Sequence, residues 1–323
     1  MRESRRSAPP SERIRERQAV RARRLGDGPI VSVDPDHPGI GDNVNGPSLI
    51  RVPPWVREPL GRYYLYFAHH RGGFIRLAHA DRLEGPWQVR ETGVLAVGDS
   101  TCIDHVASPD VVVDEANRQI RLYFHGVVVH PDGTPDPHDN AVDLTRPIVQ
   151  RSKLALSSDG LHFEARQEIL APSYLRVFRH GGAWYGLAMP GILYRSSDGL
   201  GGFERGPQIL GDDARHHAVA VRDGLAHLFF TRVGDRPERV LHAEIDLGPG
   251  WLDWTAGEAR TLLEPQTEWE GAGLALAPSV RGQVPEPVRQ LRDPAFFSDD
   301  DGDWLLYSVA GERGIALASL SGL

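Results

Sequence analysis

The sequence predicts an all-β protein in which five small sheets close into a ring, the architecture of a five-bladed β-propeller. Three observations lead to this prediction. A unit of three short strands recurs five times at a spacing of about 50 to 65 residues, as the blades of a propeller do. Gly-Gly and Asp-Gly pairs, which favour tight turns, lie between the strands. One apolar stretch is left over before the first unit, and one strand is missing after the last.

Each unit begins with a strand that is entered through a polar residue, usually beside a proline. An aromatic-rich second strand and a third strand follow. The predicted strands are residues 46–52, 63–70 and 75–80 in the first unit; 108–113, 120–126 and 153–157 in the second; 172–178, 184–189 and 192–196 in the third; 217–221, 225–233 and 239–245 in the fourth; and 293–297, 304–309 and 314–320 in the fifth.

A blade also needs an outermost strand, and four units are followed by a stretch that can supply one. These stretches are residues 86–89, 162–165, 203–206 and the region 251–263. The fifth unit has no such stretch downstream, because the sequence stops at Leu323. We therefore expect residues 29–33, which precede the first unit, to close the last blade. The alternative is a set of unconnected β-meanders.

The amino-terminal segment differs from the rest of the chain. Residues 1–27 form an arginine-rich arm, and residues 11–25 have the composition of a short helix with charged pairs across one turn. The segment lacks the apolar core of a secretory signal, so we expect a protein that is not exported. It is either a surface helix leading into the ring or a basic arm for a partner. Residues 28–323 are predicted to form the propeller as one domain.

Composition narrows the classes of partner. The net charge of −8 argues against nucleic acid or an anionic membrane as the main partner. No run of 18 apolar residues is present. Cys102 is the single cysteine, which excludes an intramolecular disulfide and favours a cytoplasmic protein. With these partners excluded, we expect a small-molecule substrate. The composition does not indicate an oligomeric state.

The entrances of the five innermost strands are the expected binding site, because polar residues there face one shared funnel. Carboxylate, imidazole, guanidinium and amide groups converge at these entrances. In blade order the residues are Asn43 and Asn45; Asp104, His105 and Asp110; Ser173 and Arg176; Arg215, His216 and His217; and Arg292 and Asp293.

Five motifs carry a resemblance to a known group of enzymes. They are residues 45–52, 63–70, 107–111, 158–163 and 292–294. With these motifs the chain, from about residue 28 to its end, resembles the five-bladed propellers of the glycoside hydrolase family 43, 32 and 117 type. The resemblance implies a carbohydrate-active enzyme. In family 43 an Asp of the first blade is the general base, an Asp of the second tunes pKa values and orients the sugar, and a Glu of the third is the acid.

The chain departs from that pattern at two of the three positions. Asp110 stands where the second-blade carboxylate is expected. Gly46 stands in place of the base, and residues 172–173, Pro-Ser, in place of the acid. The triplet Arg-Asp-Pro at 292–294 is similar to a transition-state-stabilising motif of family 32, which there belongs to a middle blade. The resemblance therefore implies the propeller and a divergent catalytic set.

Glycoside hydrolysis needs an acid for the leaving oxygen and a second carboxylate. Asp110 and Asp293 are the first pair, because their blades are separated only by blade one around a closed ring. Asp293 would be the base or nucleophile, and Asp110 the acid or the residue that tunes it. Glu270 is the alternative acid if its loop folds over the funnel. Each also has a structural interpretation: Asp110 as the cap of a strand turn, Asp293 as the ion-pair partner of Arg292, and Glu270 as a solvated side chain.

Histidine is the other candidate acid, as the resemblance to family 117 also suggests. His216 is the predicted replacement for the missing glutamate, since an unperturbed imidazole titrates near neutral pH. His105, His125 and His216 could instead hold a divalent metal such as Zn²⁺, although no closely spaced ligand motif supports one and we expect no cofactor. The predicted substrate-binding residues are Asn45, His69, Asp104, His105, His125, Arg176, His217 and Arg292.

Three functions are consistent with these residues. The first is a divergent glycoside hydrolase that acts on a small glycoside by carboxylate and histidine acid-base catalysis. The second is a lyase, isomerase, cyclase or metal-dependent enzyme that uses the same funnel. The third is a silent sugar-binding propeller in which Tyr64, Trp55 and Trp269 stack on a ring. The long connections 127–150 and 265–290 are candidate lids.

Overall fold

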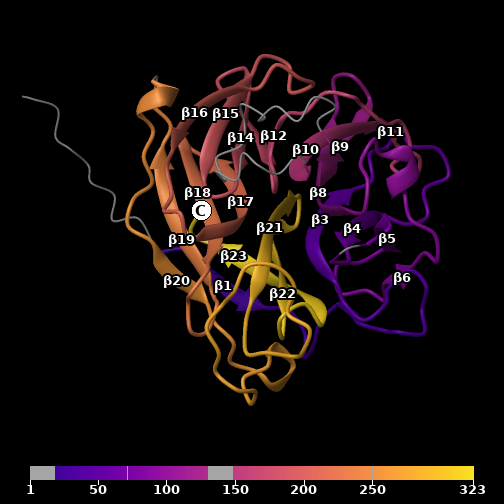
Figure 1. The fold of residues 1–323 in the computed structure, drawn as a ribbon, viewed down its shortest axis with the longest axis vertical. Coiled ribbons are helices and arrows are strands. Elements are labelled where there is room, and N and C mark those ends of the chain that lie inside the picture. Colours follow the sequence, from indigo (N-terminus) through magenta and orange to yellow (C-terminus); the bar gives the residue numbers. More distant parts are fainter. Residues whose placement is uncertain (1–18, 71, 130–147, 249) are drawn as a thin grey trace, which may run out of the picture.

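The computed structural model describes residues 19–70, 72–129, 148–248 and 250–323. They form five antiparallel sheets arranged around one centre, which confirms the predicted five-bladed propeller (Figure 1). The described part contains no α-helix, only the short 3-10 turns η1 (Val97–Asp99), η2 (Trp251–Asp253) and η3 (Glu268–Glu270). It therefore has no helix long and apolar enough to cross a membrane.

The blades follow one another along the chain. Blade one contains β3 (Asn45–Arg51), β4 (Tyr63–Ala68), β5 (Phe74–Ala80), β6 (Gln88–Val89) and β7 (Leu95–Ala96). Blade two contains β8 (Val106–Asp114), β9 (Gln119–Val129), β10 (Ile148–Ser157), β11 (Glu164–Ala165) and β12 (Ala171–Pro172). Blade three contains β13 (Arg176–His180), β14 (Ala183–Ala188), β15 (Ile192–Ser196) and β16 (Glu204–Gln208). Blade four contains β17 (Ala214–Arg222), β18 (Leu225–Arg232), β19 (Val240–Asp246) and β20 (Arg260–Leu263). Blade five contains β21 (Arg292–Asp299), β22 (Gly302–Val309) and β23 (Gly314–Ser321), together with β1 (Arg21–Arg24) and β2 (Val31–Ser32) from the start of the chain.

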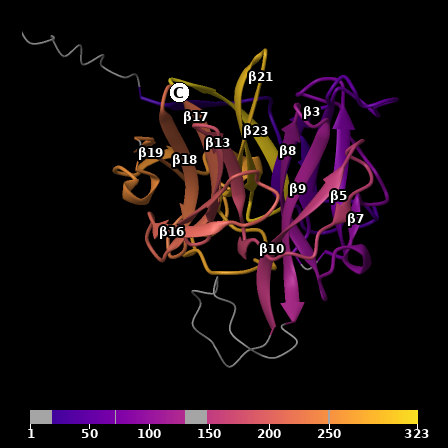
Figure 2. The same ribbon diagram turned by 90° about the horizontal axis from the view of Figure 1, so that it is seen from above.

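The first strand of each blade lies at the centre of the ring. β3 contacts β8, β8 contacts β13, β13 contacts β17, β17 contacts β21, and β21 returns to β3. Figure 1 shows β3, β8, β17 and β21 around this centre, and Figure 2 shows β9 and β10 extending past the other blades at one edge. The ring is thus closed by side-chain packing between the first and last blades.

Five apolar clusters form the core, one in each gap between neighbouring blades. Tyr66 and Val111, for example, pack between blades one and two. Leu49 and Phe297 pack between blades one and five and close the ring. Because every blade is buried on both faces, its central strands are apolar along most of their length, and the period-two alternation of a half-exposed sheet is weak.

The amino-terminal part of the chain completes blade five. β2 pairs with β23 through Val31 opposite Ile315, which confirms the predicted closing strand. β1 adds a second segment on the same edge, with Arg24 opposite Ala318. The predicted helix over residues 11–25 is wrong for residues 21–24, and residues 11–18 lie outside the described residues. A free edge of β23 offers these residues backbone hydrogen bonds, which outweigh a weak helix propensity.

The outer strands of the other blades lie where the sequence places them. β6, β11, β16 and β20 fall within or overlap the four expected stretches. Within 251–263 only the last four residues form a strand, and the first three form η2. The short strand β7, which the sequence did not indicate, pairs with β5. The predicted strand 172–178 of the third unit is wrong at its start, because Pro172 belongs to β12, which pairs with β10 of blade two, and β13 begins at Arg176.

Candidate active site in the axial cavity

The five inner strands share one backbone feature at their entrance. One residue in each blade has a positive φ: 53° at Gly46, 47° at Ser108, 64° at Tyr174, 50° at His216 and 49° at Asp293. In blades one, two, four and five the ladder to the second strand shifts its register at this point, as it does at a β-bulge. A bulge redirects a side chain. The repeated bulge therefore gives the five blades equivalent positions from which side chains face the axis.

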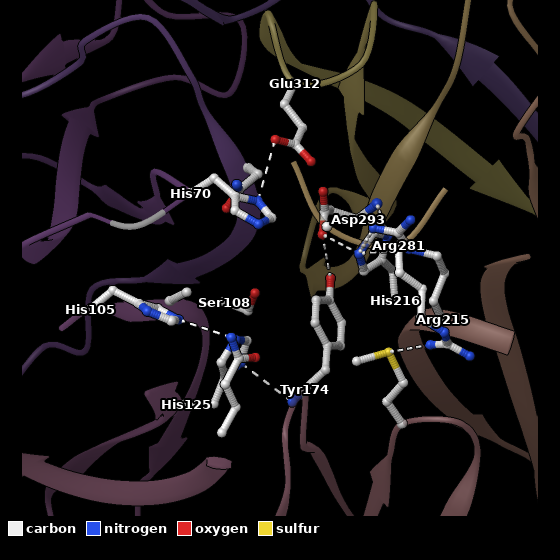
Figure 3. Close-up of a pocket in the computed structure, with 15 residues that line it drawn as sticks. His70, His105, Ser108, His125, Tyr174, Arg215, His216, Arg281, Asp293 and Glu312 are labelled. Atoms are coloured by element: carbon white, nitrogen blue, oxygen red, sulfur yellow. Dashed lines mark hydrogen bonds and ion pairs between the residues drawn. The ribbon is translucent and has the colours of Figure 1, made fainter. Parts of the chain in front are cut away.

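A cavity of about 270 Å³ lies at these entrances (Figure 3). Four of the five bulge residues, all except Gly46, contribute their side chains to its wall. The lining residues are Asn45, His70, His105, Ala107, Ser108, His125, Gln150, Tyr174, Met189, Arg215, His216, Arg281, Gly282, Asp293 and Glu312. The cavity thus brings together Asn45, His105, His125, His216 and Asp293 from the residues that the sequence singled out.

Asp293 is a buried carboxyl group that faces this cavity. Its side chain accepts a hydrogen bond from the Tyr174 hydroxyl at Oδ1, 3.1 Å away, and His216 Nε2 lies 3.5 Å from the same oxygen. Oδ2 is buried and accepts no hydrogen bond from the described residues. Burial, followed by the neighbouring charge of Glu312, raises the pKa of Asp293 to about 6. The group can hold a proton in mildly acidic solution, and one of its oxygens makes no hydrogen bond with the described residues.

Glu312 is the second carboxylate of the cavity, and the sequence did not indicate it. Asn43 Nδ2 donates to its Oε2 at 2.6 Å, Arg292 Nη1 donates to its Oε1 at 3.1 Å, and His70 Nδ1 lies 3.7 Å from Oε2. Burial opposes ionisation, but His70 and Arg292 outweigh it and lower the pKa of Glu312. The side chain therefore stays ionised. Glu312 lies in the turn between β22 and β23, where its backbone has a φ of 95°.

Arg215 of the cavity wall belongs to a network with a second arginine and a third carboxylate, neither of which lines the cavity. Arg292 is fully buried and its Nε lies 2.9 Å from Glu238 Oε2. Arg215 lies 3.7 Å from Glu238 Oε1 and donates through Nη2 to His216 Nε2 at 2.9 Å. Paired charges of this kind are fixed in place by their partners. The network holds Glu312 and His216 in position around Asp293.

His216 remains neutral in this setting. Burial, followed by Arg215 and Arg292, lowers its pKa well below the usual range. Arg215 donates to Nε2, and the backbone N–H of Asp293 donates to Nδ1 at 3.4 Å, where Thr231 Oγ1 also lies 3.4 Å away. A neutral imidazole with an accepting Nε2 is a poor proton donor. In this structure the carboxyl group of Asp293, which carries the raised pKa, is better suited to that role.

Tyr174 and Arg176 support Asp293 from blade three. Arg176 Nη2 donates to the Tyr174 hydroxyl at 3.0 Å, and the guanidinium lies 4.6 Å from the centre of the tyrosine ring. Arg176 also donates to the backbone oxygens of Pro109 and of His217, so it joins three blades. Arg176 and His217 do not line the cavity. The sequence selected Ser173 and Arg176 in this blade, whereas the side chain that lines the cavity is Tyr174.

Asp110, the other carboxylate of the predicted pair, lies at the interface between blades two and three. Its Oδ2 accepts a hydrogen bond from the backbone N–H of Val177 at 2.7 Å, and Arg176 Nη1 lies 3.5 Å from Oδ1. Ser48 has the equivalent role between blades one and two, where Oγ accepts from the N–H of Val111. Asp110 does not line the cavity. Its contacts are those of a connection between blades.

Glu270 lies at the outer side of the last blade rather than at the axis. It is fully buried and accepts hydrogen bonds from Arg24 Nε at 2.7 Å and from the Tyr307 hydroxyl at 3.0 Å. It also accepts from the backbone N–H groups of Gln266 and Thr267. The loop places Glu270 against β1, so the condition for its acting as the acid, a loop folded over the funnel, is not met.

The remaining predicted residues divide between the cavity wall and its surroundings. His105 and His125 lie on the wall that faces Asp293 across the cavity (Figure 3). Asp104, which accepts from His105 Nδ1 at 2.9 Å, and Arg292 stand behind the wall. His69 pairs with exposed Asp42, and its neighbour, His70, lines the cavity instead.

The proposed lids and stacking rings are placed as follows. Of the connection 127–150, residues 130–147 lie outside the described residues. The connection 265–290 reaches the cavity through Arg281 and Gly282. Tyr64, Trp55 and Trp269 do not line the cavity. Tyr64 is completely buried between blades one and two.

The three histidines considered as metal ligands do not form a ligand cluster. In the part of the chain that the structure describes, one group of three or more His, Cys, Asp or Glu side chains has all its ligand atoms within 4.8 Å of one another, and it lies in blade four. His105 and His125 make an edge-to-face contact with ring centres 6.3 Å apart. The imidazoles of the axial cavity are therefore arranged as separate hydrogen-bonding groups.

Solved structures with the same fold include family 43 glycoside hydrolases. The GH43_1 enzyme from Xanthomonas citri, solved with xylotriose, superposes with a TM-score of 0.57 over 91% of this chain and 89% of its own, at 14% identity. An α-L-arabinofuranosidase from Lactobacillus brevis gives a TM-score of 0.54 over 85% of this chain and 90% of its own, at 12% identity. These likenesses confirm the resemblance at the level of the fold.

The amino-acid sequence of the chain is similar to that of a viral protein. The chain is 35% identical over 312 residues to uncharacterized protein R118 of Acanthamoeba polyphaga mimivirus, covering 86% of this chain and 83% of that protein. No protein-family model matches the chain.

Proposed function

The chain belongs to the protein family of R118 from Acanthamoeba polyphaga mimivirus, and we propose that it is a divergent glycoside hydrolase that cleaves a small glycoside in the axial cavity. The observation that carries the proposal is the Asp293 carboxyl group. It is buried at the wall of the cavity, it has a free oxygen among the described residues, and Glu312 is the second carboxylate of the same cavity. The similarity to the GH43_1 enzyme supports a carbohydrate ligand, because that protein was solved with xylotriose.

Two carboxyl groups with opposite pKa shifts suit acid-base chemistry. The pKa of Asp293 is raised to about 6, so this residue supplies the proton for the leaving oxygen. The pKa of Glu312 is lowered, so this residue remains a carboxylate that activates water or stabilises positive charge on the sugar. The hydroxyl of Tyr174 fixes the orientation of Asp293. In this proposal the proton donor is therefore Asp293, in place of the predicted His216.

The cavity wall also supports a small polar substrate. At about 270 Å³ the cavity is slightly smaller than the roughly 300 to 1,000 Å³ usual for ligand pockets, which favours a small glycoside over a long polysaccharide. Asn45, His105, His125 and Gln150 supply amide and imidazole groups that can bind sugar hydroxyls. Three predicted substrate-binding residues do not line the cavity in this structure, namely Arg176, His217 and Arg292. In this proposal they act indirectly, by holding other residues in place.

The test is the hydrolysis of nitrophenyl xylosides, arabinofuranosides and galactosides at about pH 5.5, with wild type and the double variant Asp293→Asn/Glu312→Gln. We expect wild type to cleave at least one of them and the double variant to lose at least about 10³-fold in kcat/KM. Asp300→Asn, which changes an exposed carboxylate outside the cavity, is the matched control. Equal rates in wild type and the double variant would refute the proposal.

A further inference from the structure

Blade four contains a group of three possible metal ligands that the proposed hydrolysis does not use. His227 lies on β18, and His242 and Glu244 lie on β19. His227 is directly opposite Glu244 in the ladder, and His242 is two residues from Glu244 on the same face. The ligand atoms of the three side chains all lie within 4.8 Å of one another. Two adjacent strands therefore present three ligands to one point.

The distances within the group resemble those between ligands of one metal ion. His227 Nδ1 lies 3.1 Å from His242 Nε2 and 3.8 Å from Glu244 Oε1. Two nitrogens bound to tetrahedral Zn²⁺ at about 2.0 to 2.1 Å are about 3.4 Å apart. A hydrogen bond between the imidazoles also fits 3.1 Å, so a small adjustment separates a hydrogen-bonded pair from a metal-bound one.

Aromatic packing holds the two imidazoles in place. The two rings are stacked with an interplanar angle of 16°. Phe229 packs against His242 and stacks on Phe296 of blade five. The apolar shell strengthens the attraction between a cation and Glu244.

This group is distinct from the axial cavity. His227 follows the turn between β17 and β18, at the end of blade four opposite to the bulge of His216. None of the three side chains lines the cavity. A metal here would join β18 to β19 by bonds between side chains, in addition to the backbone ladder.

We propose that His227, His242 and Glu244 form a binding site for a divalent transition metal of the Zn²⁺ class, with water in the fourth position. The donor set of two imidazole nitrogens and one carboxylate oxygen suits Zn²⁺ and Co²⁺ better than Ca²⁺ or Mg²⁺. The metal stabilises blade four and leaves hydrolysis in the axial cavity to the carboxyl groups.

The experiment is a calorimetric titration of ZnCl₂ into tag-free protein after treatment with a chelator. We expect one ion per chain, and a Co²⁺ adduct with the visible absorption of a four-coordinate site. His242→Gln and Glu244→Gln should weaken Zn²⁺ binding at least about tenfold, in line with the loss of one ligand. The axial variant His105→Gln is the control and should bind as wild type does.

Three results would overturn the assignment: no stoichiometric binding by wild type, binding unchanged in both blade-four variants, or binding lost in His105→Gln. Circular dichroism establishes that each variant is folded. Should His242→Gln fail to fold, the partly exposed Glu244 still permits the test, because its replacement removes a ligand at the edge of the group. Activity of the axial cavity is not a readout, so this result is independent of the proposed function.

Discussion

At the scale of single residues, one equivalent backbone position in each blade places side chains at the axial cavity. Gly46, Ser108, Tyr174, His216 and Asp293 share a positive φ at the strand entrances of the five blades, and in all but blade three this position is a β-bulge. Evolution of such a ring can change its chemistry by exchanging side chains at five equivalent places without altering the strands. Asp293 combines this position with burial and with a neighbouring carboxylate, and these together raise its pKa.

Part of this set of cavity residues was predicted from the sequence. Asp293 and His216 were predicted because charged groups beside the start of an inner strand are visible in the sequence. Tyr174 was missed because the strand of blade three begins after an irregular segment, so the residue facing the axis could not be told from Ser173 or Arg176. Glu312 was missed because it comes from a turn of the last blade, which reaches the axis only in three dimensions.

The raised pKa of Asp293 leads to a prediction about pH. If Asp293 donates the proton, kcat/KM should fall as the pH rises through about 6, because the carboxyl group then loses the proton that the reaction needs. On the acid side activity should persist below the usual pKa of a glutamate, because Glu312 remains ionised there. A profile of kcat/KM between pH 3 and 9 measures both limbs. Activity that increases from pH 6 to pH 8 would contradict the assignment of Asp293 as proton donor.

At the scale of elements, the entrance of β3 lies close against blade two. Gly46 has φ of 53°, and a Cβ added there would lie 2.8 Å from the Ser108 Cα of blade two. The sequence located this entrance but could not show that glycine is required by the neighbouring blade. Close approach between inner strands depends on ring closure, which no local pattern records.

Gly46→Ala should therefore destabilise the protein by about 1 to 3 kcal/mol, from backbone strain and from the contact with Ser108. Equilibrium unfolding in urea measures the change. Gly73→Ala is the matched control, because an added Cβ meets no atom within 4 Å there and the backbone has no positive φ. Equal stabilities of the two variants would show that blades one and two are farther apart than described.

The amino-terminal strands illustrate why an element can be predicted in the wrong class. The arginine-rich stretch has helix-forming residues, but Arg24 of β1 is bound by Glu270 through two hydrogen bonds of 2.7 and 2.9 Å. The partner lies 246 positions away in the sequence. Propensity describes only the local chain, and this contact is set by the completed blade.

Glu270→Ala should lower the free energy of unfolding by about 2 to 4 kcal/mol, because it leaves Arg24 and the Tyr307 hydroxyl without their buried acceptor. The kcat of the variant should equal that of wild type, because Glu270 does not touch the cavity. Chemical denaturation and initial rates measure the two effects. A stable Glu270→Ala protein with lost activity would instead support the catalytic role that the sequence suggested.

At the scale of the whole molecule, the ring was predictable and the site was only partly so. Five repeated units and one leftover strand before the first unit imply closure, and the five apolar clusters between blades show how closure is achieved. The axial cavity is lined by residues of all five blades, and the relative rotation of the blades decides which polar groups meet. Asp110 and Asp293 both lie on inner strands, yet Asp110 joins two blades while Asp293 faces the cavity.

The comparison of Asp293→Asn with Asp110→Asn on one cleaved glycoside tests this account most directly. Asp293→Asn should reduce kcat/KM by about 10² to 10⁴-fold and remain folded. Asp110→Asn should keep kcat/KM within about tenfold of wild type, while losing about 1 to 3 kcal/mol of stability through its weakened contacts with Arg176 and Val177. The account would be contradicted if Asp110→Asn abolished turnover at unchanged stability while Asp293→Asn stayed active.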